Sequence, residues 1–488
     1  MLKRMIRKIT AAVCAGVIAV GCMAGVTAAA YNFKPVKGVD ENGNYIGLDL
    51  YSDSAYMINM DTGDVLIDVK STKQRVPASL TKIMTAIVLL DEFGGDKNAM
   101  ESERYSAPPE YFDGLWEMGA SVADIYPNEA VNCYDLLAAL LIPSACDAAN
   151  VIAYGMCGSI DKFCDKMNET AARIGMNDSH FSCAHGLSGD NNYSTCQDIA
   201  KACMYAIGEY DVFRDLVGMS YYYMTPTNFH PNDDWRVDNT NEMLDATSGY
   251  YYSYCCGIKT GTLESAGRCL ASYAVLDGNR YMIVTMGAPL EKLEKDYQKG
   301  YDNPDTVFAY DTIYYNMVDH INLYNWAFGY LRDRDIVDPN SEVREARVEY
   351  GDKGRDYVTL KPKSGCRATF PLYISEEDIV REITVYDNVV APVCKGDELG
   401  RIKVSYEGVE IADIPLIATE SVARSRSAEV KAVAKSFPKS REYKTVSGMC
   451  IFGIISYTVG YILWVQNKYM KKPHKPTITT NKPPTAKK

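Results

Sequence analysis

The 488-residue sequence predicts an α+β fold in which strands at both ends of the main domain enclose a group of helices. Three features predict it: a β-hairpin pattern early in the chain, helical patterns between residues 79 and 207, and two strand patterns from 269 to 286. The sequence pattern changes after residue 345. Residues 345–420 contain short β-rich runs separated by Gly, Asp, Lys and Pro, which predicts a small C-terminal all-β domain of the sandwich type.

The N-terminus has the pattern of a signal peptide. Basic residues from Lys3 to Lys8 precede an apolar stretch, and the small residues Thr27–Ala30 suit cleavage before Tyr31. Cys22 leaves a lipoprotein cleavage site open as an alternative, although the usual Leu three positions before the Cys is missing. We therefore expect residues 1–30 to be removed and the body of the chain to be exported.

The first elements of the exported part are a hairpin and a buried helix. Ala55–Asp68 has two apolar-rich strands joined by a turn at Asp61–Gly63. Pro77 precedes a helical pattern at Ser79–Leu90, which is nearly continuously apolar after Lys82. A helix buried on most of its sides is expected at the centre of a domain.

The remaining elements follow from the same patterns. We expect further helices at 133–154, 159–175 and 198–207, and two paired strands at 269–276 and 280–286 joined at Asp277–Asn279. The β-rich runs of the C-terminal domain are 347–349, 357–360, 368–372, 383–386, 400–406 and 409–415. The expected catalytic domain therefore spans 31–340, and the expected β-domain spans 345–420.

Val446–Val465 is an uncharged run of 20 residues, about the length that crosses a bilayer core as a helix. A basic linker, 421–445, precedes it, and a lysine-rich tail, 466–488, follows it. A buried core helix is the alternative, but it fits poorly beside such a tail. We expect a single C-terminal membrane pass, with the tail cytoplasmic and the body extracytoplasmic, because the signal peptide sets the orientation.

Charge is unevenly distributed along the chain. The total of 51 basic and 63 acidic residues gives −12, but both ends are basic, so residues 31–420 hold −28. A body this acidic would repel a phosphate backbone. Nucleic acid is therefore not an expected partner.

The cysteine and histidine patterns do not predict a metal centre. Of 15 Cys, 12 lie outside the membrane-directed segments, at irregular spacing without a repeated C-x-x-C, so a zinc ribbon is not supported and disulfides stay open. His180, Cys183 and His185 could be imagined as ligands, but turn and packing roles are favoured. We expect neither a metal nor a cofactor.

Ser79 and Lys82 lie three residues apart at the start of the expected central helix. One helical turn brings Ser Oγ and Lys Nζ within reach, so a Lys held neutral by its surroundings could take the Ser proton. Nearby helix N-terminal amides could stabilise a developing oxyanion. Because an S-x-x-K string also arises by chance, a polar helix start remains the alternative.

Gly257–Thr262 strengthens the catalytic interpretation. It lies directly before the strand pattern at 269, which implies a strand edge. Lys259 would supply a fixed positive charge, and Gly261 would let a substrate approach the backbone closely as an added strand. S-x-x-K followed by K-T-G is shared by β-lactamases and penicillin-binding proteins, and the two strings occur here in that order.

With these motifs the chain resembles the serine D-Ala-D-Ala carboxypeptidases, the low-molecular-mass penicillin-binding proteins. The strings that show the resemblance are Pro77–Ala86, Leu141–Asn150, His185–Leu187, Asn239–Asn241 and Gly257–Thr262. It covers about residues 40–335, while 345–420 resembles that family's C-terminal domain and a membrane anchor follows it there too. The resemblance implies the penicillin-binding/β-lactamase-like transpeptidase fold, an antiparallel sheet with a helical subdomain.

The resemblance also implies residue roles. Ser79 would be the acylated nucleophile, Lys82 its general base, and Ser144 a proton relay. The substrate-binding residues would be Lys259, Thr260, Gly261, Thr262 and Cys146. Lys259 and Thr260 would line the pocket for the terminal carboxylate, and the backbone N–H groups of Ser79 and Thr262 would form the oxyanion hole.

Cys146 departs from the family's Ser-x-Asn motif. The Asn amide helps to position the catalytic Lys, and a thiol is a much poorer hydrogen-bond group. Asn150 would compensate only if the helix were shifted. Reduced turnover with retained acylation is therefore expected, and a wall-binding protein without turnover is the alternative. A β-lactamase is disfavoured because no Glu-x-x-Leu-Asn string occurs between 150 and 257.

The sequence thus predicts a membrane-anchored, extracytoplasmic serine D-Ala-D-Ala carboxypeptidase. Ser79 would attack the bond between two D-alanines of a peptidoglycan stem peptide, and water would then hydrolyse the acyl-enzyme. The expected partners are the stem peptide, β-lactam antibiotics as inhibitors, and the membrane.

Overall fold

The computed structural model describes residues 38–39, 45–46, 50–187, 191–302, 306–352, 355–372, 374–406 and 408–470. The expected signal peptide, and the tail from 471 onward, lie outside these residues. The described chain forms two compact units. The first extends to Pro339 and includes 364–383 and 402–414, and the second contains 340–363, 384–401 and the residues from 415 onward.

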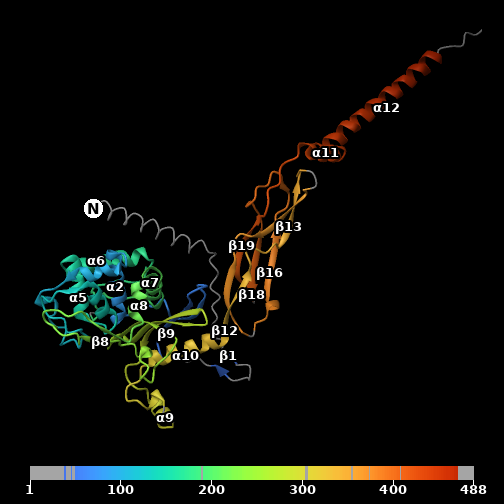
Figure 1. Ribbon diagram of the computed structural model, residues 1–488. Helices are drawn as coiled ribbons and strands as arrows, with labels where there is room; N and C mark the ends of the chain where they lie inside the picture. The colour runs from blue at the N-terminus through green and yellow to red at the C-terminus, as the bar shows by residue number, and fades with distance from the viewer. Residues whose placement is uncertain are drawn as a thin grey trace, which may run out of the picture. The chain divides into compact units, whose positions relative to one another are not determined.

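The first unit is built on an antiparallel sheet of five strands in the order β4-β3-β11-β10-β9 (Figure 1). Its strands are β3 (Ser54–Asn59), β4 (Val65–Val69), β9 (Cys255–Leu263), β10 (Gly267–Leu276) and β11 (Asn279–Ala288). The hairpin expected at 55–68 is confirmed as β3 and β4, and the pair expected at 269–286 is confirmed as β10 and β11. Strand β9 lies at the sheet edge, as the K-T-G motif implied.

The turn between β10 and β11 shows why this hairpin forms. Asp277 and Gly278 have φ of 51° and 81°, the left-handed pair that a tight two-residue hairpin turn requires. Asp tolerates this region better than most residues, and Gly enters it freely. The register that follows pairs Leu276 with Asn279.

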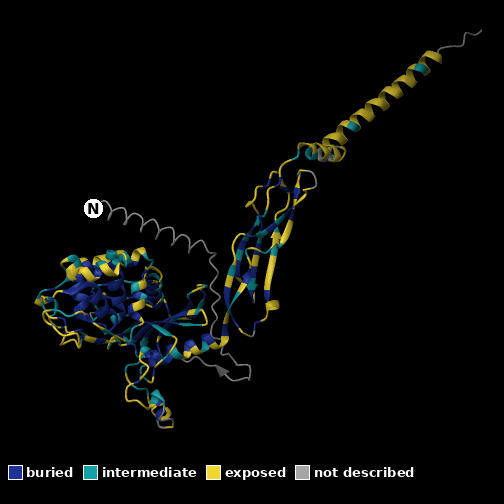
Figure 2. Cartoon of the chain, viewed as in Figure 1, coloured by how far each residue is buried: buried dark blue, intermediate teal, exposed yellow. Residues whose placement is uncertain are grey.

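Helices pack around α2 (Thr81–Phe93), whose residues from Thr81 to Leu90 are all buried. They include α4 (Cys133–Leu141), α5 (Cys146–Cys157), α6 (Ile160–Arg173), α7 (Cys196–Glu209) and α8 (Asp211–Val217). Helix α2 contacts α4, α5, α6 and α7, and Figure 2 shows this group dark blue at its centre. The buried central helix expected from its apolar sequence is confirmed.

Two sequence expectations for this region are wrong in detail. The single helix expected at 133–154 is two helices, because Pro143 interrupts the segment and Ser144 adopts a left-handed φ of 68°. The helix expected from Ser79 begins two residues later, since Ala78–Leu80 forms a 3-10 turn. Both departures occur at residues of the expected active site.

Helix α10 (Tyr315–Tyr330) covers the opposite face of the sheet. His320 and Tyr324 of this helix are fully buried and hydrogen-bond to Ser272 of β10, while His320 also contacts Thr285 of β11. Alternate residues of the same strands, Cys269 and Ala271 among them, belong to the core on the helical side. Burial lowers the pKa of His320 to about 3, so the imidazole is neutral and structural.

The strands of the C-terminal β-rich segment are β12 (Leu331–Val337), β13 (Arg344–Glu349), β14 (Tyr357–Pro362), β15 (Cys366–Pro371), β16 (Ile379–Val385), β17 (Val389–Val390), β18 (Glu398–Tyr406) and β19 (Val409–Ala418). Each of the six β-rich runs expected between 345 and 420 overlaps a strand, and the structure adds two strands that were not expected, β12 and β17. Six of them form a sheet in the order β16-β18-β19-β14-β13-β17, and β12 pairs with β15.

Shorter elements complete the described chain. The strands are β1 (Gly38–Val39), β2 (Tyr45–Ile46), β5 (Arg104–Tyr105), β6 (Val131–Asn132), β7 (Tyr221–Tyr223) and β8 (Arg236–Asp238). The helices are α3 (Lys97–Ser102), α9 (Glu294–Asp302) and α11 (Arg426–Ser436), with 3-10 turns at 78–80, 109–111, 242–244, 307–309, 376–378 and 437–439. The cysteines of the described residues are free thiols.

Helix α12 (Arg441–Tyr469) contains the expected membrane-spanning run. By length and composition it is the one described helix that could cross a membrane, and none of its apolar window is buried. Figure 2 shows it exposed along its length. A core helix would be buried, so the exposure agrees with an anchor better than with the alternative.

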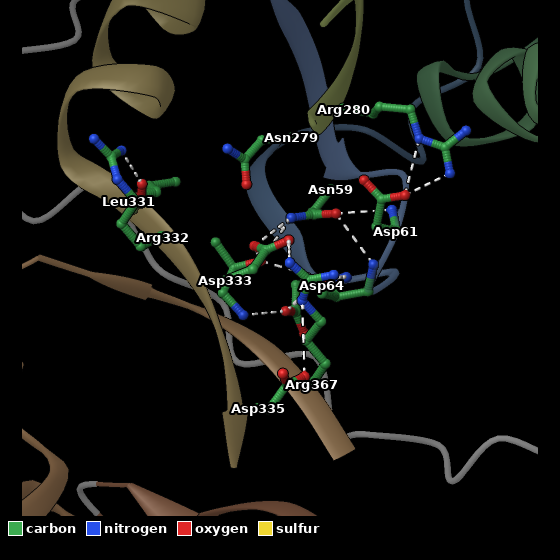
Figure 3. A network of polar contacts seen from close by, with 12 residues as sticks. Asn59, Asp61, Asp64, Asn279, Arg280, Leu331, Arg332, Asp333, Asp335 and Arg367 are labelled. Carbon is green, nitrogen blue, oxygen red and sulfur yellow. Dashed lines mark hydrogen bonds and ion pairs between the residues drawn. The ribbon is translucent and has the colours of Figure 1, made fainter. Parts of the chain in front are cut away.

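A buried polar network joins the β3–β4 hairpin to strands β12 and β15 (Figure 3). Asn59 Nδ2 donates to Asp333 Oδ1 at 2.7 Å and to Thr369 Oγ1 at 2.9 Å. The Asn59 Oδ1 atom accepts the N–H groups of Asp61 and Thr62, which shapes the hairpin turn. The Asn59 amide therefore connects the sheet to the start of the β-rich segment.

Asn59→Ala should lower the free energy of unfolding by about 1–3 kcal/mol, because it removes the amide that donates to both Asp333 Oδ1 and Thr369 Oγ1 in this buried network. Chemical denaturation of the full-length protein measures it. Arg280→Ala is the matched control, since its ion pair with Asp61 is partly exposed and should contribute under about 1 kcal/mol. Equal losses in both variants would contradict the role given to Asn59.

Candidate active site

The expected nucleophile, Ser79, lies on the 3-10 turn that leads into α2. Ala78 before it adopts a left-handed φ of 49°, and Leu80 N donates to Pro77 O at 3.1 Å. Lys82 follows one turn later, and its Nζ lies 2.9 Å from Ser79 Oγ. The structure thus brings the S-x-x-K pair into direct hydrogen-bond contact.

Lys82 is fully buried. Burial lowers its pKa below the ordinary 10.5, while the nearby Cys146, Cys183 and Asp147 act in the opposite direction. The Nζ atom has a second partner, His185 O at 2.8 Å. An amine whose pKa is lowered, held against a hydroxyl, has the form that a general base requires.

Two glycines let the backbone close around Ser79. A Cβ on Gly186, which has φ of 87°, would lie 2.0 Å from Ala78 O, and one on Gly261 would lie 3.2 Å from Ser79 N. Strand β9 and the His185–Leu187 segment therefore pack directly against the Ser79 turn. The His185-Gly-Leu string serves this packing, and its His carbonyl holds Lys82.

Ser144 and Cys146 lie at the break between α4 and α5. Cys146 N donates to Ser121 O at 2.8 Å, which ties the break to the segment that follows α3. Cys146 is almost fully buried, and its sulfur lies close enough to Lys82 to raise that amine's pKa. The thiol therefore lies near the Lys82 amine, at the position where the resemblance implies an Asn amide.

Lys259 is the second buried lysine of the site. Burial, and then the charge of Lys82, lower its pKa well below the ordinary value. Among the described residues, the hydrogen-bond partners of the two lysines are oxygens of Ser79, His185 and Thr260, none of which is anionic. Because neither amine has a carboxylate as a hydrogen-bond partner, no ion pair offsets the lowering of their pKa values by burial.

These residues surround a pocket of about 210 Å³. Six of the eight expected site residues line it: Ser79, Ser144, Cys146, Thr260, Gly261 and Thr262. Lys82 and Lys259 lie behind the wall as buried side chains. Thr240, from the Asn239–Asn241 string, also lines the pocket and hydrogen-bonds to Thr260.

Arg268 is a pocket residue that the sequence analysis missed. It lies on β10 directly opposite Thr262 of β9, so the two side chains share a face of the sheet. Its guanidinium lies 4.6 Å from the ring centroid of Tyr314. Its buried Nε has no hydrogen-bond partner among the described residues.

The register of the β9–β10 hairpin was the signal that could have found Arg268. The expected strand begins at 269, two residues later than β10, so Arg268 falls outside the pattern. Once Thr262 is placed in the site, the residue paired with it becomes a candidate. A cation with an unused donor can hold an anionic group of a ligand.

The other residues that the sequence analysis considered for the site form hydrogen bonds within the chain. Asn150 Nδ2 donates to Tyr111 O at 2.8 Å, away from the pocket, so it does not replace the motif Asn. His180 Nδ1 contacts Asn191 O, and His185 Nδ1 accepts from Leu187 N. Burial and Lys82 lower the pKa of His185 to about 4, which keeps its imidazole neutral.

Asp147 follows Cys146 and fixes the segment that borders the pocket. Its carboxylate accepts from Ala123 N at 3.0 Å and Ile125 N at 3.0 Å. Burial raises its pKa to about 6 despite these donors. Helix α5 thus fixes both the Cys146 side of the pocket and the neighbouring loop.

Comparison with known proteins gives consistent results. The sequence profile of the family described as D-alanyl-D-alanine carboxypeptidase matches residues 40–290, and that of the penicillin-binding protein 5 C-terminal domain matches 332–424. D-alanyl-D-alanine carboxypeptidase DacF of Bacillus subtilis is 25% identical over 375 residues, covering 76% of this chain and 86% of the relative.

Two further similarities cover different parts of the chain. The D-alanyl-D-alanine carboxypeptidase of Streptomyces sp. strain K15 is 30% identical over 241 residues, 47% of this chain and 78% of the relative. The crystal structure of penicillin binding protein 5 from Haemophilus influenzae matches with a TM-score of 0.58 at 20% identity, over 78% of this chain and all of that one. The second similarity concerns the fold alone.

Proposed function

Because the chain belongs to the D-alanyl-D-alanine carboxypeptidase family, we propose that Ser79 is the nucleophile with which it releases the terminal D-alanine of peptidoglycan stem peptides. The protein is a serine-type hydrolase with a penicillin-binding fold. The observation that carries the proposal is the 2.9 Å contact between Lys82 Nζ and Ser79 Oγ, with the amine buried and its pKa lowered.

Acylation follows from these positions. Neutral Lys82 takes the Ser79 proton, and Ser79 Oγ attacks the carbonyl carbon of the penultimate D-alanine. The N–H groups of Ser79 and Thr262 stabilise the oxyanion. The C–N bond then breaks, and the amine of the departing D-alanine receives its proton from Lys82 through Ser144.

Deacylation repeats the same proton transfers with water in place of Ser79. Lys82 takes a proton from water, the resulting hydroxide attacks the ester, and Ser79 Oγ leaves with a proton returned by Lys82. The Cys146 thiol lies near Lys82, at the position where an amide would otherwise orient the amine. We therefore propose that this chain hydrolyses its acyl-enzyme more slowly than a relative with Asn there, and that penicillins acylate it at Ser79.

The terminal carboxylate of the substrate has a defined place. Edge strand β9 leaves one side open for an extended peptide. Lys259 and Thr260 contribute to the carboxylate end of the pocket, and we add Arg268, whose buried Nε has no hydrogen-bond partner among the described residues. The Arg268 guanidinium lies over the Tyr314 ring, and Arg268 pairs with Thr262 across the two strands.

The alternatives from the sequence are less well supported. A protein that only binds the cell wall would not require Lys82 to be buried against Ser79, and membership of the carboxypeptidase family favours hydrolysis. Membership of the same family disfavours a β-lactamase, as does the match of residues 332–424 to a carboxypeptidase C-terminal domain.

We also propose that the enzyme is held at the outer face of the cell membrane by residues 446–465, after removal of residues 1–30. The support is the exposed apolar helix α12 with lysines beyond its end. The proposed boundaries are 31–340 for the catalytic domain, 345–420 for the β-domain, 421–445 for the linker and 466–488 for the cytoplasmic tail.

Ser79→Ala should abolish D-alanine release from a peptide ending in D-Ala-D-Ala, by about 10³-fold or more, because no other described residue replaces the nucleophile. The assay is D-alanine production by the full-length protein in detergent. Cys146→Asn is the companion variant and should release D-alanine faster than the wild type. Release that persists in Ser79→Ala would refute the assignment of the nucleophile.

Arg268→Gln should lower kcat/KM for the same peptide by about 10- to 100-fold, the loss expected for a hydrogen bond between charged groups. The matched control is the same peptide with a C-terminal amide in place of the carboxylate. The wild type should prefer the free acid, and Arg268→Gln should lose most of that preference. If the variant slows both substrates equally, Arg268 does not bind the carboxylate.

A further inference from the structure

A second pocket adjoins the catalytic one. It has a volume of about 230 Å³, and its lining includes Leu115, Trp116, Val122, Tyr126 and Asp147. Neighbouring residues of the chain face the two pockets: Ser121 and Cys146 line the catalytic one, while Val122 and Asp147 line the other. The two cavities therefore adjoin across these two backbone segments.

Large apolar side chains around this pocket face solvent. Trp116 is 87% exposed, Met118 49% and Tyr126 50%. The Tyr126 ring stacks on Phe229, which is itself exposed, with centroids 5.4 Å apart and planes 14° from parallel. Exposed aromatic rings gathered at a pocket mark a binding surface.

The pocket is preformed. Asp147 accepts the N–H groups of Ala123 and Ile125, and Trp235 Nε1 donates to Ala123 O at 2.9 Å. Cys146 N donates to Ser121 O. These bonds fix the segment between the two pockets although it has no regular secondary structure, so a ligand would meet an ordered surface.

The negative charge of the chain around this pocket limits the class of ligand that it can bind. Residues 108–126 contain Glu110, Asp113, Glu117 and Asp124 and no basic residue. An anionic membrane surface or a phosphate-rich polymer would be repelled here. A neutral sugar chain fits both features, because its apolar ring faces pack on aromatic rings and its hydroxyl and amide groups donate to carboxylates.

We propose that this aromatic pocket binds the N-acetylated amino-sugar strand that carries the stem peptide. The inference rests on the proposed function, since the sugar strand is the polymer to which that peptide is attached. Docking the strand beside the catalytic pocket raises the local concentration of its peptides at Ser79. Trp116 provides the main stacking surface, and Tyr126 on Phe229 provides a second one.

The test is calorimetric titration of the full-length protein with a tetramer of N-acetylglucosamine, in a zwitterionic detergent without a sugar head group. The wild type should bind, and Trp116→Ala should bind about five- to tenfold more weakly. Tyr357→Ala is the control, because Tyr357 is a 53% exposed aromatic residue of β14, remote in sequence. It should bind like the wild type.

Activity gives an independent readout. Trp116→Ala should release D-alanine from a free peptide at the wild-type rate and from glycan-linked peptides more slowly. Tetramer binding that is absent or insensitive to Trp116, or Trp116-dependent binding to anionic lipid vesicles, would overturn the inference. The proposed function would be overturned instead if the tetramer bound in a Trp116-dependent way while D-alanine release was absent or did not depend on Ser79. The two failures are therefore distinguishable.

Discussion

The burial of Lys82 against Ser79 is the constraint on which the rest of the site depends. A lysine removed from water without a carboxylate partner is costly as an ammonium ion, so the environment favours the neutral amine. That environment is supplied by α2 at the centre of the helical group, by the His185 carbonyl, and by close backbone approaches at Gly186 and Gly261. The packing of the helical group therefore sets the pKa of the Lys82 amine.

The site contains three basic side chains in two different environments. Two amines, Lys82 and Lys259, lie behind the pocket wall; burial lowers the pKa of both, and the charge of Lys82 lowers that of Lys259 further. Arg268, which stays charged at any working pH, lies in the pocket itself and is held by Tyr314. In the proposed mechanism Arg268 and Lys259 bind the substrate carboxylate, and Lys82 transfers the proton.

Much of this could be predicted from the sequence where local patterns decide the structure. The β3–β4 hairpin, the buried α2, the strands of the β-rich segment and the S-x-x-K and K-T-G motifs are all local. The break between α4 and α5 could not be placed, since Pro143 permits a break but the left-handed Ser144 is fixed by tertiary contacts such as Cys146 N to Ser121 O. Arg268 depends on the pairing of two strands, and the pocket beside Trp116 depends on Asp147 reaching a distant loop, so neither has a local signal.

The most direct test of this account is the pH dependence of Ser79 acylation by a fluorescent penicillin, measured as a rate on the full-length protein. Because only the neutral amine accepts a proton, the rate should rise with pH through the pKa of Lys82. The account predicts a midpoint below 10.5, the ordinary lysine value, and no acylation of Lys82→Arg at any pH, since a guanidinium does not deprotonate. A midpoint at or above 10.5, or acylation retained in Lys82→Arg, would contradict it.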